Sequence, residues 1–190
     1  MVLYLREADT QCRLAIGAVV GLNNALNATP DNPDGSTNWD RFRVIQGEIF
    51  RSVHSLLTHV SCLSRLLWPP ASQGASGKAQ QRGAALREKL GLADDGHTLK
   101  KRTLRDHLEH FDERIDDWCE SSVRKNYAQD IVAPRGGISG LEDTDIMRWY
   151  DPERTVFTFR GDEFNIQELV ASVEELRPLL AAALESIEPR

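Results

Sequence analysis

The chain has 190 residues, of which 41% are hydrophobic and 27% are charged, a composition typical of a globular protein with one sizeable core. We therefore expect a single domain over residues 1–190. The formal net charge of -6 argues against a protein that coats nucleic acid by bulk electrostatics, because such binding needs clustered Lys and Arg.

Cysteine usage and hydropathy predict the compartment. Cys12, Cys62 and Cys119 are far apart, show no C-x-x-C spacing and fall in apolar helical patterns, so we expect reduced core residues of a cytoplasmic protein. The apolar run 14–22 follows acidic residues that do not suit a signal peptide. No run approaches the roughly 18 apolar residues of a membrane span, and we expect a soluble protein.

Long helices dominate the first half of the chain. Apolar residues that recur at steps of three and four predict a helix over about residues 4–28 and a longer one over 39–67. A shorter amphipathic helix is expected over 81–91, where Gly91 ends it. Such helices, joined by short connections, are typical of an up-and-down bundle of four to five helices.

The segment 98–122 predicts the clearest helix. Its apolar residues share one face, and the remaining positions are densely charged. The stripe consists of Leu104, Leu108, Phe111, Ile115 and Trp118.

A small β element is expected near the end of the chain. The runs 146–150 and 155–159 are rich in β-formers, and the turn between them has Pro152 at its second position. We expect one β-hairpin at about 145–160, inserted before the last helix. A lone hairpin is marginal in water, so its apolar side chains should pack on the helices: Met147, Trp149, Phe157 and Phe159.

The last helix has a clear start signal. Asn165 and Glu168 are spaced as a capping box, and the apolar pattern runs from there to about Ile187. The sequence therefore predicts a mainly α fold, an up-and-down helical bundle with a β-hairpin insert.

One stretch of the predicted helix 98–122 carries chemistry. Arg105 is followed five residues later by His110, and the polar Asp106 comes directly after the arginine. The stretch 105–110, with sequence RDHLEH, resembles the R-x(4-6)-H motif of the HEPN superfamily. The resemblance covers the bundle pattern of about residues 4–125 and the last helix, whereas the hairpin departs from it.

The resemblance implies a metal-independent endoribonuclease that acts as a homodimer and needs no cofactor. Such a reaction requires a base, an acid and a cation for the charge that grows on the phosphate. His110 suits the first two roles and Arg105 the third. By resemblance, two such pairs line one cleft of the dimer, and the protein is a toxin or defence effector with an antitoxin or regulatory protein as partner.

Other residues of the stretch have supporting roles in this hypothesis. Asp106 is one turn before His110 and is expected to orient its ring, while Arg102 and His107 repeat the motif spacing as accessory candidates. Lys100 and Lys101 are the expected RNA contacts. On a straight helix, five residues separate two side chains by about 140° around the axis, so Arg105 and His110 converge only through a distortion or a dimer partner.

Three alternatives remain open. The charged face of the segment is also explained by i,i+4 ion pairs on a solvated helix. A catalytically inactive bundle of the same shape would bind a protein or nucleotide partner. A metal site resembling DinB-like bundles would combine His107 and His110 with His54 or His59, although Arg114 would repel a cation there; we expect no metal.

Overall fold

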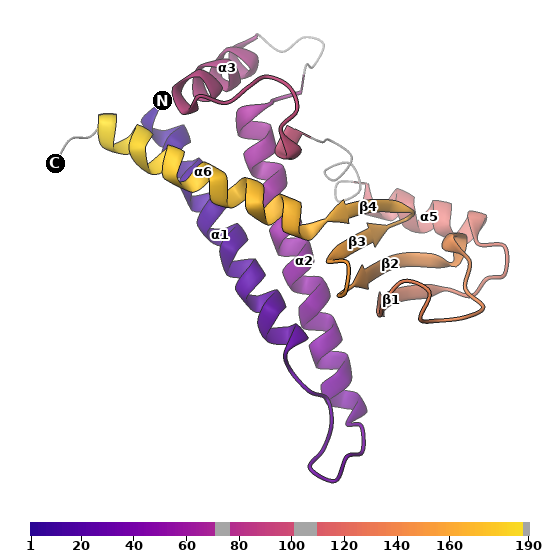
Figure 1. Cartoon of the computed structure of the whole chain (residues 1–190). Helices are drawn as coiled ribbons and strands as arrows, with labels where there is room; N and C mark the ends of the chain where they lie inside the picture. The colour runs from indigo at the N-terminus through magenta and orange to yellow at the C-terminus, as the bar shows by residue number, and fades with distance from the viewer. Residues whose placement is uncertain (71–76, 101–109, 188–190) are drawn as a thin grey trace.

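The computed structural model describes residues 1–70, 77–100 and 110–187, without the side chain of Phe111. The chain is mainly helical with a small four-stranded sheet. Figure 1 shows the helices crossing one another at one end of the molecule and the sheet at the other. Among the described residues, no helix combines the length and the apolar character needed to cross a lipid bilayer.

Helices α1 (Val2–Leu26) and α2 (Trp39–Leu67) form a long hairpin, as predicted. The buried face of α1 is rich in alanine, and Gly21 allows a close approach, since an added Cβ would lie 2.9 Å from Oγ of Ser52. Asn38 caps the start of α2, and its side chain accepts a hydrogen bond from the Arg41 amide at 3.0 Å. The tip of the hairpin projects beyond the other helices (Figure 1).

Two further helices complete the helical part. Helix α3 (Lys78–Leu90) ends at Gly91, which has the left-handed conformation expected of a C-terminal cap. Helix α6 (Ile166–Ile187) packs across α1 and contacts α3. The predicted cap of α6 is confirmed in part, because Oδ1 of Asn165 accepts a hydrogen bond from the Glu168 amide at 3.0 Å.

The expected lone hairpin is part of a larger sheet. Strands β2 (Ile146–Asp151) and β3 (Val156–Phe159) pair antiparallel, as predicted, but β1 (Ala128–Val132) adds parallel to β2 and β4 (Asp162–Asn165) adds antiparallel to β3. The two added strands are short, and one residue in each is buried. They lack the alternating pattern that identifies a strand from sequence, so the hairpin prediction was incomplete.

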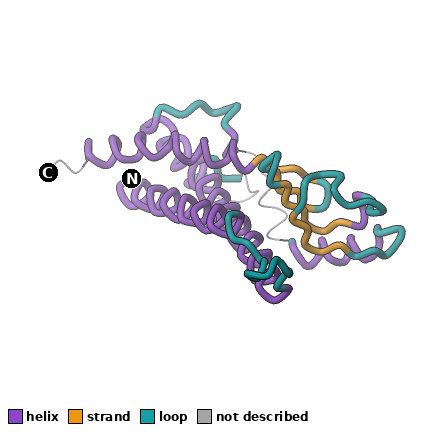
Figure 2. Tube along the Cα trace, turned by 60° about the horizontal axis from the view of Figure 1, so that its bottom comes forward, coloured by secondary structure: helices purple, strands orange, loops and turns teal. Residues whose placement is uncertain are grey.

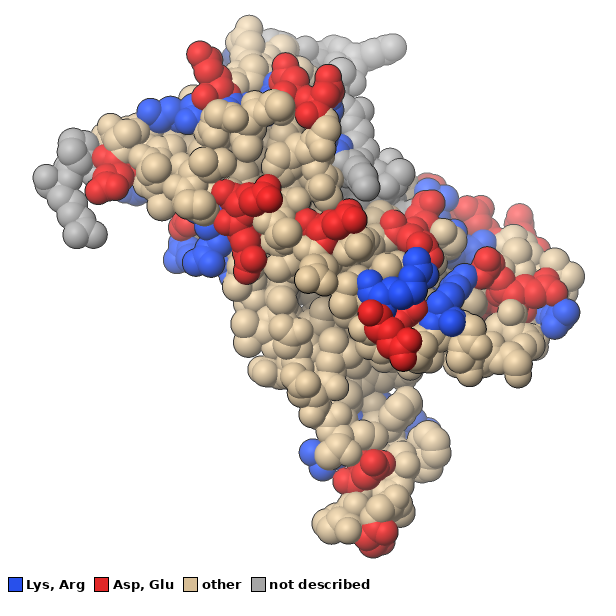
Figure 3. Space-filling view, in the orientation of Figure 1, with Lys and Arg blue, Asp and Glu red and all other residues tan. Residues whose placement is uncertain are grey.

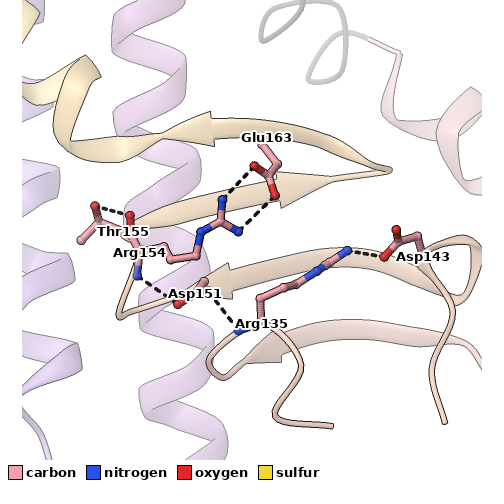
Figure 4. A network of polar contacts seen from close by, with 6 residues as sticks. All are labelled: Arg135, Asp143, Asp151, Arg154, Thr155 and Glu163. Atoms are coloured by element: carbon pink, nitrogen blue, oxygen red, sulfur yellow. Dashed lines mark hydrogen bonds and ion pairs between the residues drawn. The ribbon is translucent and has the colours of Figure 1, made fainter. Parts of the chain in front are cut away.

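The turn between β2 and β3 is held by a buried carboxylate. Oδ1 of Asp151 accepts a hydrogen bond from the amide of Arg154, and Oδ2 accepts one from the amide of Arg135 (Figure 4). Oδ1 also accepts a hydrogen bond from the amide of Glu153. Burial opposes ionisation, but these backbone donors and the nearby Arg154 charge hold the pKa of Asp151 below its ordinary value. The Arg154 guanidinium also pairs with Glu163 on β4 at 3.2 Å, which ties the turn to the edge strand.

The apolar side chains of the sheet divide between two clusters. Met147, Phe157 and Phe159 belong to the main core, as expected. Trp149 instead packs with Ile131 and Ile146 in a separate small cluster, and its indole N–H donates to the Ala133 carbonyl at 2.7 Å. The prediction that Trp149 packs on the helices was therefore wrong, because β1 supplies its partners.

The predicted helix over 98–122 is not continuous in the described part. A 3-10 turn, η1, covers Thr98–Lys100, and α5 spans Phe111–Ser121. His110 has φ -115° and ψ 41°, outside the helical region, and its carbonyl accepts the first hydrogen bond of α5, from the Arg114 amide at 3.1 Å. Helix α5 lies beside the sheet and outside the bundle of α1, α2 and α6 (Figures 1 and 2).

The cysteines are confirmed only in part as core residues. All three are free thiols: Cys12 is buried, Cys62 is half-buried and Cys119 is exposed. Burial, with Asp9 nearby, raises the pKa of the Cys12 thiol to about 12. The placement of Cys119 in the core was wrong, because α5 buries Trp118 and leaves the next residue facing water.

Candidate functional site

Most of the candidate site residues predicted from the sequence lie outside the described residues. This applies to Lys101, Arg102, Arg105, Asp106 and His107. The other two candidates, Lys100 and His110, are described and differ in their surroundings.

His110 stands at the start of α5 with half of its side chain exposed, 51% of it being accessible to water. Its Nδ1 is 3.3 Å from Oε1 of Glu113, three residues further along the same helix. When Nδ1–H donates to this carboxylate, Nε2 becomes the nitrogen that can exchange a proton with a ligand. The described part of the site is therefore an accessible imidazole whose ring is oriented by an acidic neighbour.

Glu113 was missed by the sequence analysis, which gave the orienting role to Asp106. Both residues are near His110 in sequence, one at i-4 and the other at i+3. The spacing to Glu113 is a signal for a side-chain pair on a helix. The spacing alone does not identify the His110–Glu113 pair, because the structure was needed to show that His110 directly precedes the first turn of α5.

The side chain of Lys100 already has partners in the loop that precedes it. Its ammonium donates to the Asp94 carbonyl at 2.8 Å and to the carboxylate of Asp95. The Lys100 contact holds the pKa of Asp95 below its ordinary value. An RNA phosphate would have to compete with these two acceptors for Lys100.

A pocket of about 340 Å³ lies next to Lys100, with Trp68 and Arg87 in its wall. The ring of His97 packs on Trp68 at 4.8 Å, and burial lowers the pKa of His97. The charged groups of the wall are paired with each other, Arg87 with Asp94 at 2.5 Å and Lys100 with Asp95. The pocket therefore presents no unbalanced charge to a ligand.

A second group of polar side chains follows one face of α5. His110, Arg114, Asp117 and Ser121 recur at steps of four, three and four residues, which places them in a row along the helix. Arg114 lies 3.4 Å from Oδ2 of Asp117. Arg160, from the turn between β3 and β4, donates to Oγ of Ser121 at 2.6 Å.

The other histidines of the metal alternative have different partners. Nε2 of His54 is 3.5 Å from Arg148, and Nδ1 of His59 is 2.7 Å from Oε1 of Gln11. Burial, together with the Arg148 charge, lowers the pKa of His54 to about 4. In residues 1–70, 77–100 and 110–187, no group of three or more His, Cys, Asp or Glu side chains is placed to hold a metal ion.

On the face drawn in Figure 3, basic and acidic side chains lie next to one another at the sheet end, and much of the projecting hairpin of α1 and α2 is uncharged. This face therefore carries no large area of basic side chains alone. Comparisons with protein-family models, with curated proteins and with solved structures found no match. The functional argument therefore depends on the residues of the chain itself.

Proposed function

We propose that this chain is a metal-independent endoribonuclease of the HEPN type that acts as a homodimer. The observation that carries the proposal is the accessible imidazole of His110, which ends the RDHLEH motif and lies 3.3 Å from a carboxylate that can orient it. An imidazole that is accessible and held by a carboxylate has the functional group needed for general acid–base catalysis.

The proposed reaction needs only protein side chains. One imidazole removes the proton of a 2′-hydroxyl, whose oxygen attacks the adjacent phosphorus atom while the bond to the 5′-oxygen breaks. A second imidazole donates a proton to that 5′-oxygen, and the products are a 2′,3′-cyclic phosphate and a 5′-hydroxyl. Arg105 would stabilise the charge on the phosphate through its planar guanidinium. The homodimer supplies the second histidine, and a toxin of this kind would be held in check by an antitoxin or regulatory protein.

An exposed aromatic pair favours a second candidate, a catalytically inactive bundle that binds a protein partner. Trp39, 66% exposed, and Phe42 contact each other edge to face, with ring centroids 5.7 Å apart, at the start of α2. Large apolar side chains grouped in water often belong to an interface. This candidate requires no role for His110.

Cleavage of RNA in the presence of EDTA tests the proposal. The untagged wild type should cut single-stranded RNA and leave 2′,3′-cyclic phosphate ends, whereas His110→Ala should lose about 100-fold or more in rate. His59→Gln is the matched control, because His59 bonds to Gln11 on α1 and has no part in the reaction. Intact RNA with the wild type, together with equal growth of cells that express either protein, would exclude the nuclease and favour the protein-binding bundle.

A further inference from the structure

The pocket of about 340 Å³ next to Lys100 lies where three segments of the chain meet. Its wall consists of Trp68 and Pro69, which directly follow α2, of two side chains of α3, Gln80 and Arg87, and of charged residues between α3 and the end of η1. Pockets that bind small molecules typically measure about 300–1,000 Å³. This one therefore has room for a small ring compound.

A close contact between α3 and the end of α2 holds the wall together. A Cβ added at Gly83 would lie 2.6 Å from Cδ of Pro69 and 2.8 Å from the Leu67 carbonyl oxygen, so only glycine allows this approach. Nη1 of Arg87 donates to the same carbonyl, and the guanidinium lies 6.0 Å from the centre of the Trp68 ring. The pocket is therefore formed before a ligand arrives, which lowers the cost of binding.

The charged side chains of the wall are already paired with each other. Arg87 pairs with Asp94, and Lys100 pairs with Asp95. A charged ligand would have to displace one of these partners and leave its charge unpaired, whereas an uncharged ligand leaves both ion pairs intact. The wall therefore favours an uncharged ligand.

Two polar groups of the wall are unused. Trp68 is 6% exposed, and its buried indole N–H has no hydrogen-bond partner in the described part of the chain. Nε2 of Gln80 donates to the Pro70 carbonyl at 2.8 Å, but its buried Oε1 accepts no hydrogen bond from any described residue. Because buried polar groups are nearly always hydrogen-bonded, one donor and one acceptor of the wall remain for a ligand.

We propose that this pocket binds an uncharged aromatic carboxamide. An amide is an uncharged group that offers an acceptor and a donor together. Its oxygen accepts from the indole of Trp68 and its N–H donates to Oε1 of Gln80, so both unused groups gain partners. The ring lies against the apolar surface of Trp68 and Pro69. The inference goes beyond the proposed nuclease, because it gives no role to His110.

Calorimetric titration of the full chain with benzamide tests the inference. The wild type should bind benzamide with a Kd of about 1 mM or below, a value within reach of a ligand of this size. N,N-dimethylbenzamide keeps the oxygen but has no N–H for Gln80, and should bind about tenfold more weakly. Benzoate should also bind more weakly, because its charge has no free partner in the wall.

Two pairs of substitutions locate the site. Trp68→Phe removes the indole N–H but keeps an aromatic ring, and should raise the Kd for benzamide by about tenfold. Trp118→Phe is its matched control and should leave the Kd unchanged, because the indole N–H of Trp118 is likewise buried without a partner among the described residues, but lies on α5. Gln80→Met should abolish the difference between benzamide and its dimethyl analogue. Gln81→Met, at an exposed position of the same helix, should preserve that difference.

The outcomes decide the inference without reference to RNA. A wild type that binds no benzamide overturns it, as does equal affinity for benzamide and its dimethyl analogue. Equal weakening by Trp68→Phe and Trp118→Phe would place the binding elsewhere and overturn it too. The comparison of ligands on the wild type needs no substitution, so a variant that fails to fold leaves the test intact. Cleavage of RNA in EDTA is measured separately, and the pocket and the nuclease can each fail alone.

Discussion

Asp130 and Arg148 face each other across the parallel strands β1 and β2 and form a two-pronged ion pair. Nε of Arg148 is 2.6 Å from Oδ1 of Asp130, and Nη2 donates to Oδ2 at 3.0 Å. The guanidinium also lies 5.6 Å from the ring centre of Phe50 on α2. This pair connects the edge strand, the central hairpin and the long helix.

The Asp130–Arg148 pair gives a first prediction. Arg148 is 12% exposed at its side chain, so Asp130→Asn would leave a largely buried charge without its carboxylate and should lower the free energy of unfolding by about 1–3 kcal/mol. Glu163→Gln breaks the Arg154 pair, in which both side chains are about half exposed, and should cost less than about 1 kcal/mol. Urea unfolding of the two variants checks this; equal losses would contradict it.

His54 gives a prediction about pH. Its pKa is lowered from 6.5 to about 4 in the folded protein, so the unfolded chain binds more protons between these values. Its contribution to stability is therefore complete above pH 6.5 and is lost as the pH falls towards 4, by about 2–3 kcal/mol. His54→Gln should show a shallower fall in the free energy of unfolding over this range. Parallel curves for the two proteins would show that His54 is not responsible.

Two glycines of α1 make a matched pair. An added Cβ at Gly17 meets nothing within 4 Å, whereas one at Gly21 lies 2.9 Å from Oγ of Ser52 on α2. Gly17→Ala should stabilise the protein by about 0.5–1 kcal/mol, because alanine favours the helix. Gly21→Ala should lose this gain, since Ser52 must move, and should be about 1 kcal/mol less stable than Gly17→Ala. Thermal unfolding of both variants decides it, and an equal rise in Tm would count against the close approach of the two helices.

Glu113 gives a prediction about catalysis, if the chain cuts RNA as proposed. Its carboxylate is 3.3 Å from Nδ1 of His110 and acts as a positioning group. Glu113→Gln should reduce kcat by about tenfold with little change in KM, because it affects the orientation of the ring rather than substrate binding. Glu120→Gln, an exposed glutamate of the same helix, is the control. A change in KM alone would assign Glu113 to binding instead.

The sequence by itself determined the elements whose signals are local. The apolar rhythm predicted α1, α2 and α6, and Asn165 marked the start of the last helix, because side chains three or four residues apart share a helix face whatever surrounds them. The turn that carries Pro152 was identified from its own residues, because proline at the second position favours a type I turn. The role of His110 is a further prediction from the sequence, based on a motif of six residues.

Only the tertiary structure decided how distant segments meet. Strand β1 pairs with β2, although the segment that connects them carries no recognisable secondary-structure pattern. Because of this pairing, Trp149 packs in a second cluster and not in the main core. The same is true of Arg160, which reaches α5 from a turn 39 residues after Ser121. Such contacts depend on the register of strands and on the path of the chain, which local periodicity does not encode. The sequence therefore singled out His110 as a candidate, whereas only the fold shows which charged side chains lie around its helix.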